Sequence, residues 1–344
     1  MIEIAPERLR DVVRDVFVAA GTPEGAACQV AMSLVENNLM GHDSHGVLRV
    51  GWYVDSILTG RVDPKAEITI ERQSATTALV DGGNNFGQLV ARQAMDIAMS
   101  KAREHDLGLV ASHHCGHTGR MGEYAVQAAE QGFVGMVFGS GSAKGGIVAP
   151  YLGTGRFLNT NPTAWAVPAA KHPPVFLDFA TSVVAQGKVQ AAIDKGVTIP
   201  EDWLLDADGR PTTDPNDQRN GGVLMPFGRH KGYCMSFLVE ILCGGLSGAL
   251  CGSLATYCPD YATLFLAINI EAFQPLDEFR QMVDEMVAEV KKVRKAEGVE
   301  EILVPGEPEW RTKEQRLREG LHLPEATWER IVESGAKCGL TVTV

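Results

Sequence analysis

Two imidazoles, a carboxylate, a hydroxyl and a guanidinium lie within eight residues of one another near the start of the chain. They belong to His42, Asp43, Ser44, His45 and Arg49 in the segment LMGHDSHGVLRV. An imidazole titrates near neutral pH and can deliver or accept a proton, and a guanidinium can grip a carboxylate through two parallel hydrogen bonds. The segment therefore has the composition of an acid–base site that holds an organic anion, although a solvated helix face can also contain such residues.

The spacing predicts how three of the polar groups would be presented. If residues 45–58 are helical, His45, Arg49 and Tyr53 follow one another at intervals of four and form one stripe, away from the apolar face. Such a stripe could hold a carboxylate on Arg49 while His45 exchanges a proton with a neighbouring oxygen. Tyr53 would then add a phenol to the substrate-binding surface.

His117 is a second candidate, in the segment GHTGRMGEY after a run predicted to be a strand. Ligands commonly bind where the strands of a sheet end, so we expect this imidazole to face a binding site. A loop histidine whose ring is satisfied by backbone groups is the simpler alternative.

Histidine pairs also raise the question of a metal site. His42 and His45 are three residues apart, and His113 and His117 are four apart. Zinc sites usually add a carboxylate or thiolate at a recognisable spacing, and the chain contains neither H-E-x-x-H nor C-x-x-C. We therefore predict no metal, with a His-ligated metal-dependent hydrolase or lyase as the alternative from another class. The pattern assigns no role to His42 or His114.

Nucleophilic catalysis has little support. Ser44 is adjacent to His45, but neighbouring residues seldom direct their side chains at each other. The chain also lacks the G-x-S-x-G elbow that exposes a nucleophilic serine. Acyl transfer is therefore not the favoured chemistry.

The segment FGSGSAKGG, residues 138–146, has the composition of a phosphate-binding loop. A Rossmann loop needs G-x-G-x-x-G leading directly into a helix whose first amides receive the pyrophosphate. Here the spacing is G-x-G-x-x-x-G, Pro150 and two further glycines follow, and the next acidic residue is Asp178. We predict a turn near an active site rather than a Rossmann site, and Lys144 remains without a role.

The elements that would position these residues begin with helices. Residues 6–20 place apolar side chains at helical spacing, and Thr22 with Pro23 marks the start of a second helix that ends near Asn37. A third helix is predicted over residues 44–58. The first seventy residues are thus expected to be helical.

From Thr76 onward, strand-like and helical runs alternate, which is typical of an α/β fold with a mostly parallel or mixed sheet. The segment 196–232 is rich in Pro and Gly and is predicted to be loop, and the two helical ends of the chain are expected to pack on each other. Strands are predicted over 77–81, 107–112, 133–139, 175–179 and 263–270, and helices over 87–104, 120–131, 183–195, 233–249, 275–297, 311–319 and 324–336.

Composition disfavours several functions. The 344 residues include 43 acidic and 31 basic side chains, and a net charge of −12 argues against nucleic acid and anionic membranes as partners. The N-terminal segment MIEIAPERLRDVV is not a signal peptide, and the longest apolar stretch, residues 237–254, contains Glu240. The seven cysteines include no C-x-x-C pair. We therefore expect a cytoplasmic protein whose thiols are reduced and mostly buried.

Five segments of the chain resemble the type-2 malate/L-lactate dehydrogenase family in order and approximate spacing. They are GHDSHGVLRV, GHTGRMGEYA, LNTNPTAWAVP, DFATSVVAQGKV and GRHKGYCMSFLVEIL. This family also includes ureidoglycolate, sulfolactate and diketogulonate oxidoreductases and a cyclic-imine reductase. The resemblance implies a non-Rossmann NAD(P)-binding α/β domain with a mixed sheet, flanked by a helical domain built from both chain ends.

The same resemblance implies a division of the chain. Residues 1–72 with 308–344 would form the helical substrate and dimerisation domain, and residues 73–307 the α/β NAD(P)-binding catalytic domain. We expect a homodimer with the active site near the subunit interface.

The resemblance also implies roles for single residues. His45 matches the proton donor to the substrate carbonyl, Ser44 the hydroxyl that supports it, and Arg49 the carboxylate clamp. Thr160 matches a substrate contact, and His117 a residue that is catalytic in some members and contacts the cofactor in others. The other cofactor-binding positions are Asp178, Phe179, Ala180, His230, Lys231, Gly232, Gly306 and Glu307.

Two positions depart from the family pattern. The imine-reducing branch carries an acidic relay residue ten positions after the Asp of its DFATS-like segment, and here that position is Lys188. Asn159 stands where a glycine usually precedes TNP, which changes one wall of the expected substrate pocket.

We therefore expect an NAD(P)-dependent 2-hydroxy acid dehydrogenase with His45 as proton donor and acceptor. A hydride would pass between NAD(P)H, as NAD or NADP, and C2 of a small malate- or lactate-like acid. An NADPH-dependent cyclic imine or N-alkyl amino acid reductase is the alternative within the family, and Lys188 disfavours it.

Overall fold

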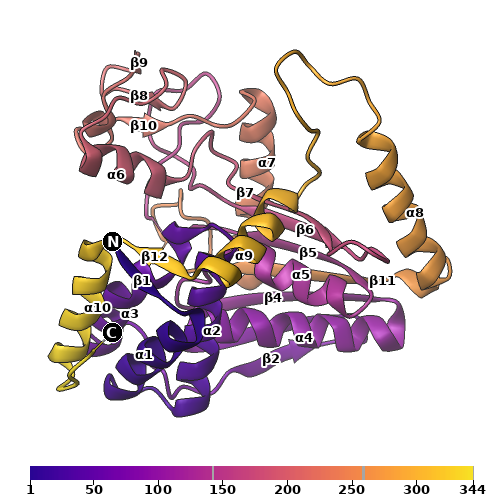
Figure 1. The fold of residues 1–344 in the computed structure, drawn as a ribbon, viewed down its shortest axis with the longest axis horizontal. Helices are drawn as coiled ribbons and strands as arrows, with labels where there is room; N and C mark the ends of the chain where they lie inside the picture. The colour runs from indigo at the N-terminus through magenta and orange to yellow at the C-terminus, as the bar shows by residue number, and fades with distance from the viewer. Residues whose placement is uncertain (142, 258–259, 344) are drawn as a thin grey trace.

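The computed structural model describes residues 1–141, 143–257 and 260–343. Its centre is a seven-stranded sheet in the order β2-β3-β4-β11-β5-β6-β7 (Figure 1). Within it β3 and β4 run parallel, and the other neighbouring strands pair antiparallel. The strands are β2 (Thr69–Gln73), β3 (Thr77–Asn85), β4 (Leu107–Cys115), β5 (Phe133–Gly139), β6 (Thr163–Val167), β7 (Val175–Phe179) and β11 (Thr263–Asn269).

The mixed sheet confirms the predicted α/β fold, but two of its strands lie outside the predicted runs. All five residues of β2 are exposed, so this edge strand has no apolar alternation that a sequence pattern could detect. In β6 the buried side chains are small, in the segment TAWAV. Between β5 and β6 the described residues contain no helix, which agrees with the rejection of a Rossmann loop at residues 138–146, where Ser142 lies outside the described residues.

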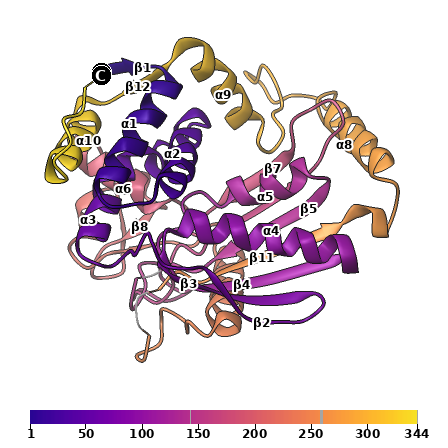
Figure 2. The same cartoon turned by 90° about the horizontal axis from the view of Figure 1, so that it is seen from below.

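Two helices cover one face of the sheet. α4 (Gly87–His105) packs on β3, β4 and β11, and α5 (Gly122–Glu130) packs on β5 and β6 (Figure 2). The buried side of α4 is built from alanines and methionines, which allow its backbone to approach the sheet closely. The closest approach is at Gly108 of β4, where an added Cβ would lie 1.9 Å from the carbonyl oxygen of Ala98.

The opposite face of the sheet is covered by α7 (His230–Glu240). Val110 and Ala111 point to opposite faces, and Ala111 packs with Val239 and Cys243 of this helical segment. The helix predicted over 233–249 begins earlier, at His230. From Ile241 to Gly245 it continues as a π-helical turn instead of an α-helix.

Both ends of the chain pack into one helical cluster, as predicted. Its helices share a core that includes Phe17, Leu34, Val54 and Trp328. β1 (Ile2–Ile4) pairs antiparallel with β12 (Leu321–Leu323), which joins the two ends directly. The helices are α1 (Pro6–Ala19), α2 (Glu24–Leu39), α3 (Val50–Leu58) and α10 (Glu325–Lys337), with α9 (Glu307–Glu319) lying against α2.

The remaining segments form a small lobe and one outlying helix. α6 (Gln186–Lys195) packs with a three-stranded sheet of β8 (Leu204–Leu205), β9 (Pro211–Thr212) and β10 (Val223–Leu224), so the loop predicted over 196–232 contains short strands. α8 (Leu276–Val290) ends seven residues before the predicted boundary. The chain turns there, and the Lys291 ammonium binds Glu301 and Glu307.

The structure tests two further expectations from the sequence, one about membrane-spanning helices and one about the burial of the cysteine thiols. In the described part of the chain, no helix combines the length and apolar character needed to cross a bilayer. The expectation of mostly buried thiols is wrong, because Cys28, Cys251 and Cys338 are half-buried and Cys234 is exposed, while Cys115 and Cys243 are buried. Cys258 lies outside the described residues.

The contact between β4 and α4 predicts a stability difference between two glycine substitutions. Gly108→Ala places a methyl group against backbone that cannot move away, and we expect it to lower the free energy of unfolding by about 2 kcal/mol or more. The matched control is Gly25→Ala in α2, where nothing lies within 4 Å and a helical alanine should be neutral or stabilising by up to about 1 kcal/mol. Urea unfolding measures both, and equal stability of the two variants would contradict the packing argument.

Candidate active site

The segment that carries the candidate residues is a broken turn, not one helix. Asp43–His45 and Val47–Arg49 are two short 3-10 turns separated by Gly46, whose backbone is extended at φ −87 and ψ −151. The α-helix begins only at Val50. The predicted helix over 44–58 is therefore wrong in its first six residues.

The break at Gly46 is held by Asn38, at the end of α2. The amide of Val47 donates to Asn38 Oδ1 at 2.8 Å, and a Cβ on Gly46 would lie 2.2 Å from that same oxygen. A neighbouring contact comes from Asn37 Nδ2, which donates to the carbonyl of His45 at 3.2 Å. Two consecutive asparagines thus position the backbone on either side of the glycine.

Because of this break, the predicted stripe of His45, Arg49 and Tyr53 does not form. Tyr53 is only 4% exposed and packs in the same apolar core as Val47 and Val54, so it does not lie on the opposite face. Its hydroxyl oxygen accepts from Gln88 Nε2 at 2.8 Å, and it lies 2.8 Å from His117 Nδ1. The structure therefore places the phenol behind His117 as its hydrogen-bond partner.

The two candidate imidazoles meet face to face. The rings of His45 and His117 are nearly parallel, with centroids 5.7 Å apart and 13° between their planes. His117 comes two residues after β4 ends, as the sequence predicted, and Trp52 and Tyr261 lie against its ring at 5.3 and 5.5 Å. Residues far apart in the chain are thus brought into one half-buried aromatic group.

Ser44 and His45 also contact each other. Ser44 Oγ lies 3.1 Å from His45 Nδ1, so the expectation that these adjacent side chains would diverge is wrong. The contact occupies Nδ1 and leaves Nε2 as the ring nitrogen that can exchange a proton with a ligand.

Burial keeps both imidazoles neutral. The pKa of His45 is lowered to about 3, first by desolvation and then by the nearby charges of Arg49, His42 and Arg120. The pKa of His117 is also well below its ordinary value, again mainly because of burial. His45 ends a short 3-10 turn, so burial and not a helix N-terminus is the main cause of its lowered pKa.

His45 opens on a cavity of about 280 Å³, which we name the inner cavity. Three candidate groups predicted from separate motifs line it together: the imidazole of His45, Thr160, and the segment from Asp178 to Ala180. Lys188 lines the same cavity, on α6. The structure therefore brings these parts of the predicted site together.

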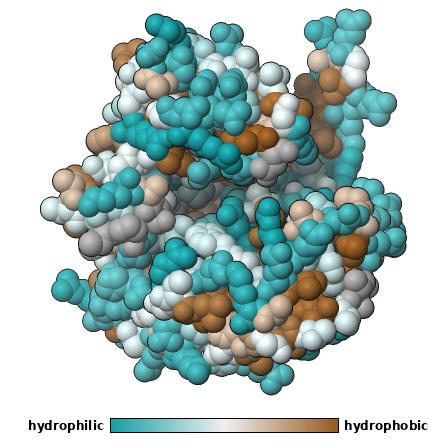
Figure 3. Space-filling model, turned by 90° about the vertical axis from the view of Figure 1, so that its left-hand side faces the viewer, coloured by the Kyte–Doolittle hydropathy of each residue, from teal (hydrophilic) through white to brown (hydrophobic). Residues whose placement is uncertain are grey.

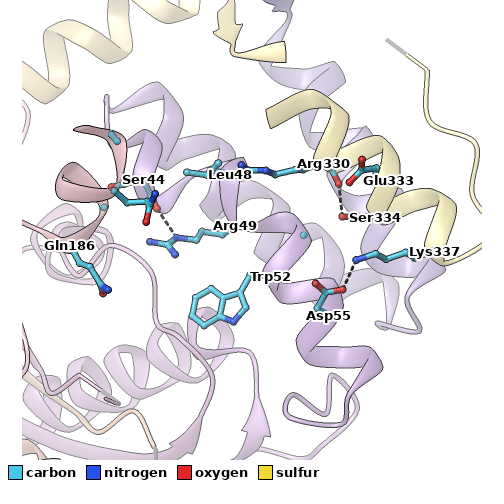
Figure 4. Close-up of a pocket in the computed structure, with 14 residues that line it drawn as sticks. Ser44, Leu48, Arg49, Trp52, Asp55, Gln186, Arg330, Glu333, Ser334 and Lys337 are labelled. Carbon is cyan, nitrogen blue, oxygen red and sulfur yellow. Dashed lines mark hydrogen bonds and ion pairs between the residues drawn. The ribbon is translucent and has the colours of Figure 1, made fainter. Parts of the chain in front are cut away.

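Arg49 opens on a different space. It lines a larger cavity of about 660 Å³, the outer cavity, between α3, α6 and α10 (Figure 4). Its Nε donates to the carbonyl of Ser44 at 2.7 Å, and its guanidinium carbon lies 5.4 Å from the Trp52 ring centroid. The surface is hollowed on the face of the molecule that Figure 3 shows. Ser44 lines both the inner and the outer cavity.

The remaining predicted cofactor residues lie elsewhere. His230 and Lys231 are exposed at the start of α7, and Gly232 fits against the Phe227 carbonyl, 2.2 Å from where a Cβ would be. Glu307 lines a third cavity of about 220 Å³ and binds Lys291 at 2.8 Å. The adjacent Gly306 has a φ of 85° and packs against Phe176 of β7.

The histidine pairs considered for metal binding are not the ones that the structure groups. His113 and His114 have stacked rings 4.2 Å apart, and with Asp81 they place potential ligand atoms within 4.8 Å of one another. His117 lies in the aromatic group with His45 instead. His42 pairs with Glu309 at 3.6 Å.

Sequence reasoning missed Arg120, which lines the inner cavity and is only 4% exposed. It occurs three residues after His117 in the same segment, and that proximity was the one available signal. It also missed Asn37, Asn38 and Gln88, because a buried amide on a helix has no recognisable pattern in the sequence.

Comparisons with known proteins agree along almost the whole chain. The family described as malate/L-lactate dehydrogenase matches residues 4–332. An L-sulfolactate dehydrogenase from Methanothermobacter thermautotrophicus is 38% identical over 337 residues, which cover 96% of each chain. A malate dehydrogenase from Pyrococcus abyssi is 38% identical over 350 residues, covering 98% of this chain and 96% of the relative. The solved structure of a malate dehydrogenase from Entamoeba histolytica superimposes with a TM-score of 0.93 at 28% identity, covering 100% and 99% of the two chains.

The lowered pKa of His45 predicts a component of acid denaturation. Between pH 6.5 and about 3 the unfolded chain takes up a proton at this residue and the folded chain does not, so stability falls as the pH falls. We expect His45→Gln to reduce the slope of the free energy of unfolding against pH by up to about 1.4 kcal/mol per pH unit. The measurement is urea unfolding between pH 4 and 7.

The matched control is His105→Gln, because His105 is exposed at the end of α4. It should keep the wild-type slope. If His45→Gln also keeps that slope, the buried neutral state assigned to His45 is wrong.

Proposed function

This chain belongs to the malate/L-lactate dehydrogenase family and is an oxidoreductase that acts on 2-hydroxy acids, and we propose that His45 transfers the proton in that reaction. The substrate would be a small 2-hydroxy acid, converted reversibly into its 2-oxo acid. The single observation that carries the proposal is the stacked pair of His45 and His117, with nearly parallel rings 5.7 Å apart beside Arg49.

Dehydrogenases of this family typically use NAD(P)H, and we place the cofactor in the inner cavity. When bound, NAD or NADP exchanges a hydride with C2 of the substrate. Two features of the cavity suit such a ligand. Phe179 is 40% exposed and offers an apolar surface for a ring, and Arg120 offers a buried cation for an anionic oxygen. Glu307 lines the separate third cavity, which lies at the Val175 end of β7. Phe179, at the other end of that strand, lines the inner cavity.

His45 is set up as a proton acceptor. Its lowered pKa keeps the ring neutral at neutral pH, so Nε2 can take the proton from a substrate hydroxyl as the hydride leaves. Reduction of the 2-oxo acid needs the opposite state. The negative charge of a bound acid favours the imidazolium, and the alkoxide that forms at the carbonyl oxygen then takes its proton.

His117 supports His45 from behind. Gln88 donates to the Tyr53 oxygen, so we assign the Tyr53 hydroxyl as the donor to His117 Nδ1 and the His117 proton to Nε2. This chain of three side chains fixes the ring that stacks on His45. We propose that His117 orients His45 and holds the substrate oxygen, while Tyr53 acts through His117 instead of touching substrate.

Arg49 is proposed as the clamp for the carboxylate next to C2. One side of its guanidinium is fixed by the Ser44 carbonyl and the Trp52 ring. In the described part of the chain, no carboxylate forms an ion pair with it, so its remaining donors are available for a substrate carboxylate. Ser44, which bonds both His45 and Arg49, would couple the clamp to the proton donor.

Cyclic imine reduction is the competing activity within the family. The structure places Lys188 in the wall of the inner cavity, where the imine-reducing branch would need an acid. A cation at this position favours an anionic 2-oxo acid over a substrate that must be protonated.

Substrate class is therefore the first test of the proposal. We expect NAD(P)H-dependent reduction of 2-oxo acids to exceed reduction of piperideine- or pyrroline-2-carboxylate at neutral pH. The measurement is kcat/KM for a panel of both classes with each reduced cofactor, after treatment with a chelator. A cyclic imine as the best substrate would overturn the assignment, and loss of all activity on chelation would favour metal chemistry.

The pH dependence of two variants tests the role of His45. In the wild type, reduction should decline as the pH rises, because the protonated imidazole is depleted, and oxidation should be favoured over the same interval. We expect His45→Ala to lower kcat in both directions by roughly 10²–10⁴-fold, with NAD(P)H binding nearly unchanged.

The companion variant is His117→Ala, which should lower the rate but keep the pH dependence. If His45→Ala keeps the wild-type profile and His117→Ala loses it, the proton belongs to His117 and the segment around His45 is scaffold.

A further inference from the structure

Arg120 has a guanidinium inside the protein that is only partly satisfied. It lies between β4 and α5, is only 4% exposed, and stacks on Phe176 with its guanidinium carbon 5.7 Å from the ring centroid. Its Nε donates to Asn37 Oδ1 at 2.9 Å, but its Nη1 is buried without a hydrogen-bond partner. Among the described residues, no carboxylate forms an ion pair with it within 4.0 Å.

A buried cation without a partner is costly, so chains usually place a carboxylate beside it. This chain does so nearby: Arg92 binds the buried carboxylate of Glu123 at 2.6 Å. Two acids interact with Arg120 from beyond ion-pair distance: Asp178, whose Oδ2 accepts from the amide of Gly122 at 2.7 Å, and Glu309, which pairs with His42 at 3.6 Å. Burial also raises the pKa of Asp178, although the charge of Arg120 opposes that shift. The positive charge of Arg120 is therefore incompletely compensated in the free protein.

The location of Arg120 connects it to the proposed chemistry. It lines the inner cavity together with His45 and Thr160, and Lys188 adds a second cation to the same cavity. Asn37 links it to the active-site turn, because the other end of the Asn37 amide donates to the His45 carbonyl. Arg49 opens on the outer cavity, so its guanidinium is not part of the lining of the inner cavity.

We propose that Arg120 and Lys188 form an anion-binding subsite in the inner cavity, distinct from the carboxylate clamp at Arg49. The subsite takes a carboxylate, sulfonate or phosphate oxygen on the ligand that reacts beside His45. Two ligands carry such a group: a 2-oxo acid with a second acidic group, and the cofactor with its phosphates. This inference rests on the proposed function for its substrate and cofactor, but its anion chemistry can be measured without turnover.

A purely structural role for Arg120 makes a different prediction. Its bond to Asn37 and its contact with Phe176 would hold α2 and β7 near α5, and a variant would then lose stability without any change in ligand selectivity. The tests therefore need readouts that separate binding from folding.

The experiment uses the full chain with Arg120→Gln and Arg120→Lys, and Arg92→Gln as the matched control, since Arg92 is ion-paired and lies outside the lining of the inner cavity. Dissociation constants are measured for NADH, NADPH and ADP-ribose by titration. Values of kcat/KM are measured for oxaloacetate, which carries two carboxylates, and for pyruvate, which carries one. Thermal unfolding of each variant reports folding.

If the subsite holds the substrate's second acid, Arg120→Gln lowers kcat/KM for oxaloacetate by roughly 10- to 100-fold, as expected for a lost charge-assisted hydrogen bond, and changes pyruvate by less than about 3-fold. If it holds a cofactor phosphate, the dissociation constants of NAD(P)H and ADP-ribose rise by a similar factor, and the ratio between the two oxo acids stays constant. In either arm Arg120→Lys should recover part of the effect, and Arg92→Gln should show neither.

Unchanged ADP-ribose binding together with an unchanged oxaloacetate-to-pyruvate ratio in a folded Arg120→Gln protein would overturn the proposal and leave Arg120 as a packing residue. Failure of the proposed function is recognised separately. In that case the wild type reduces neither oxo acid, while ADP-ribose binding still tests Arg120.

Discussion

The hydrogen bond between Asn38 and the backbone amide of Val47 determines the geometry of the candidate active-site turn. It holds the chain extended at Gly46, where any larger residue would collide with the asparagine. Without this break, α3 would begin before His45, and the imidazole would project from the surface of that helix. With it, His45 stacks on His117, and Arg49 folds back onto the carbonyl of Ser44. One amide side chain thus separates the proposed proton donor from the proposed clamp.

Burial gives the site its electrostatic character. The imidazoles of His45 and His117 and the phenol of Tyr53 are strongly desolvated, and the histidines are neutral as a result. The pKa of Tyr53 is raised by the same burial, so its hydroxyl stays protonated beside His117 Nδ1. The positive charges of Arg49 and Arg120 are not cancelled by ion pairs among the described residues. An anionic ligand would supply the missing charge and make protonation of His45 easier at the same time.

The mixed sheet explains why the contributing segments meet. β4 carries His117 and Arg120 in the loop that follows it, and β7 ends at Phe179, so both loops open on the inner cavity. α2 reaches the same place from the helical cluster and contributes Asn37 and Asn38. The cavity is therefore built at the boundary between the sheet and the helices of the chain ends. Substrate and cofactor groups would meet there while each is held by a different part of the fold.

Local chemistry in the sequence was enough to identify the segment with His42 to Arg49, the strand before His117, the alternation of strands and helices, and the helical chain ends. These features depend on side-chain types, near-neighbour spacing and apolar periodicity, which act within a few residues. The exposed edge strand β2, the break at Gly46 and the end of α8 at Val290 were not accessible in this way. Each depends on a contact with a distant or non-periodic partner.

Only the tertiary structure brings the Tyr53 hydroxyl against His117, opens Arg49 and His45 on different cavities, and places Arg120 in the lining of the inner cavity. Burial and hydrogen-bond satisfaction are properties of the whole packed chain, and no spacing of residues along the sequence determines them.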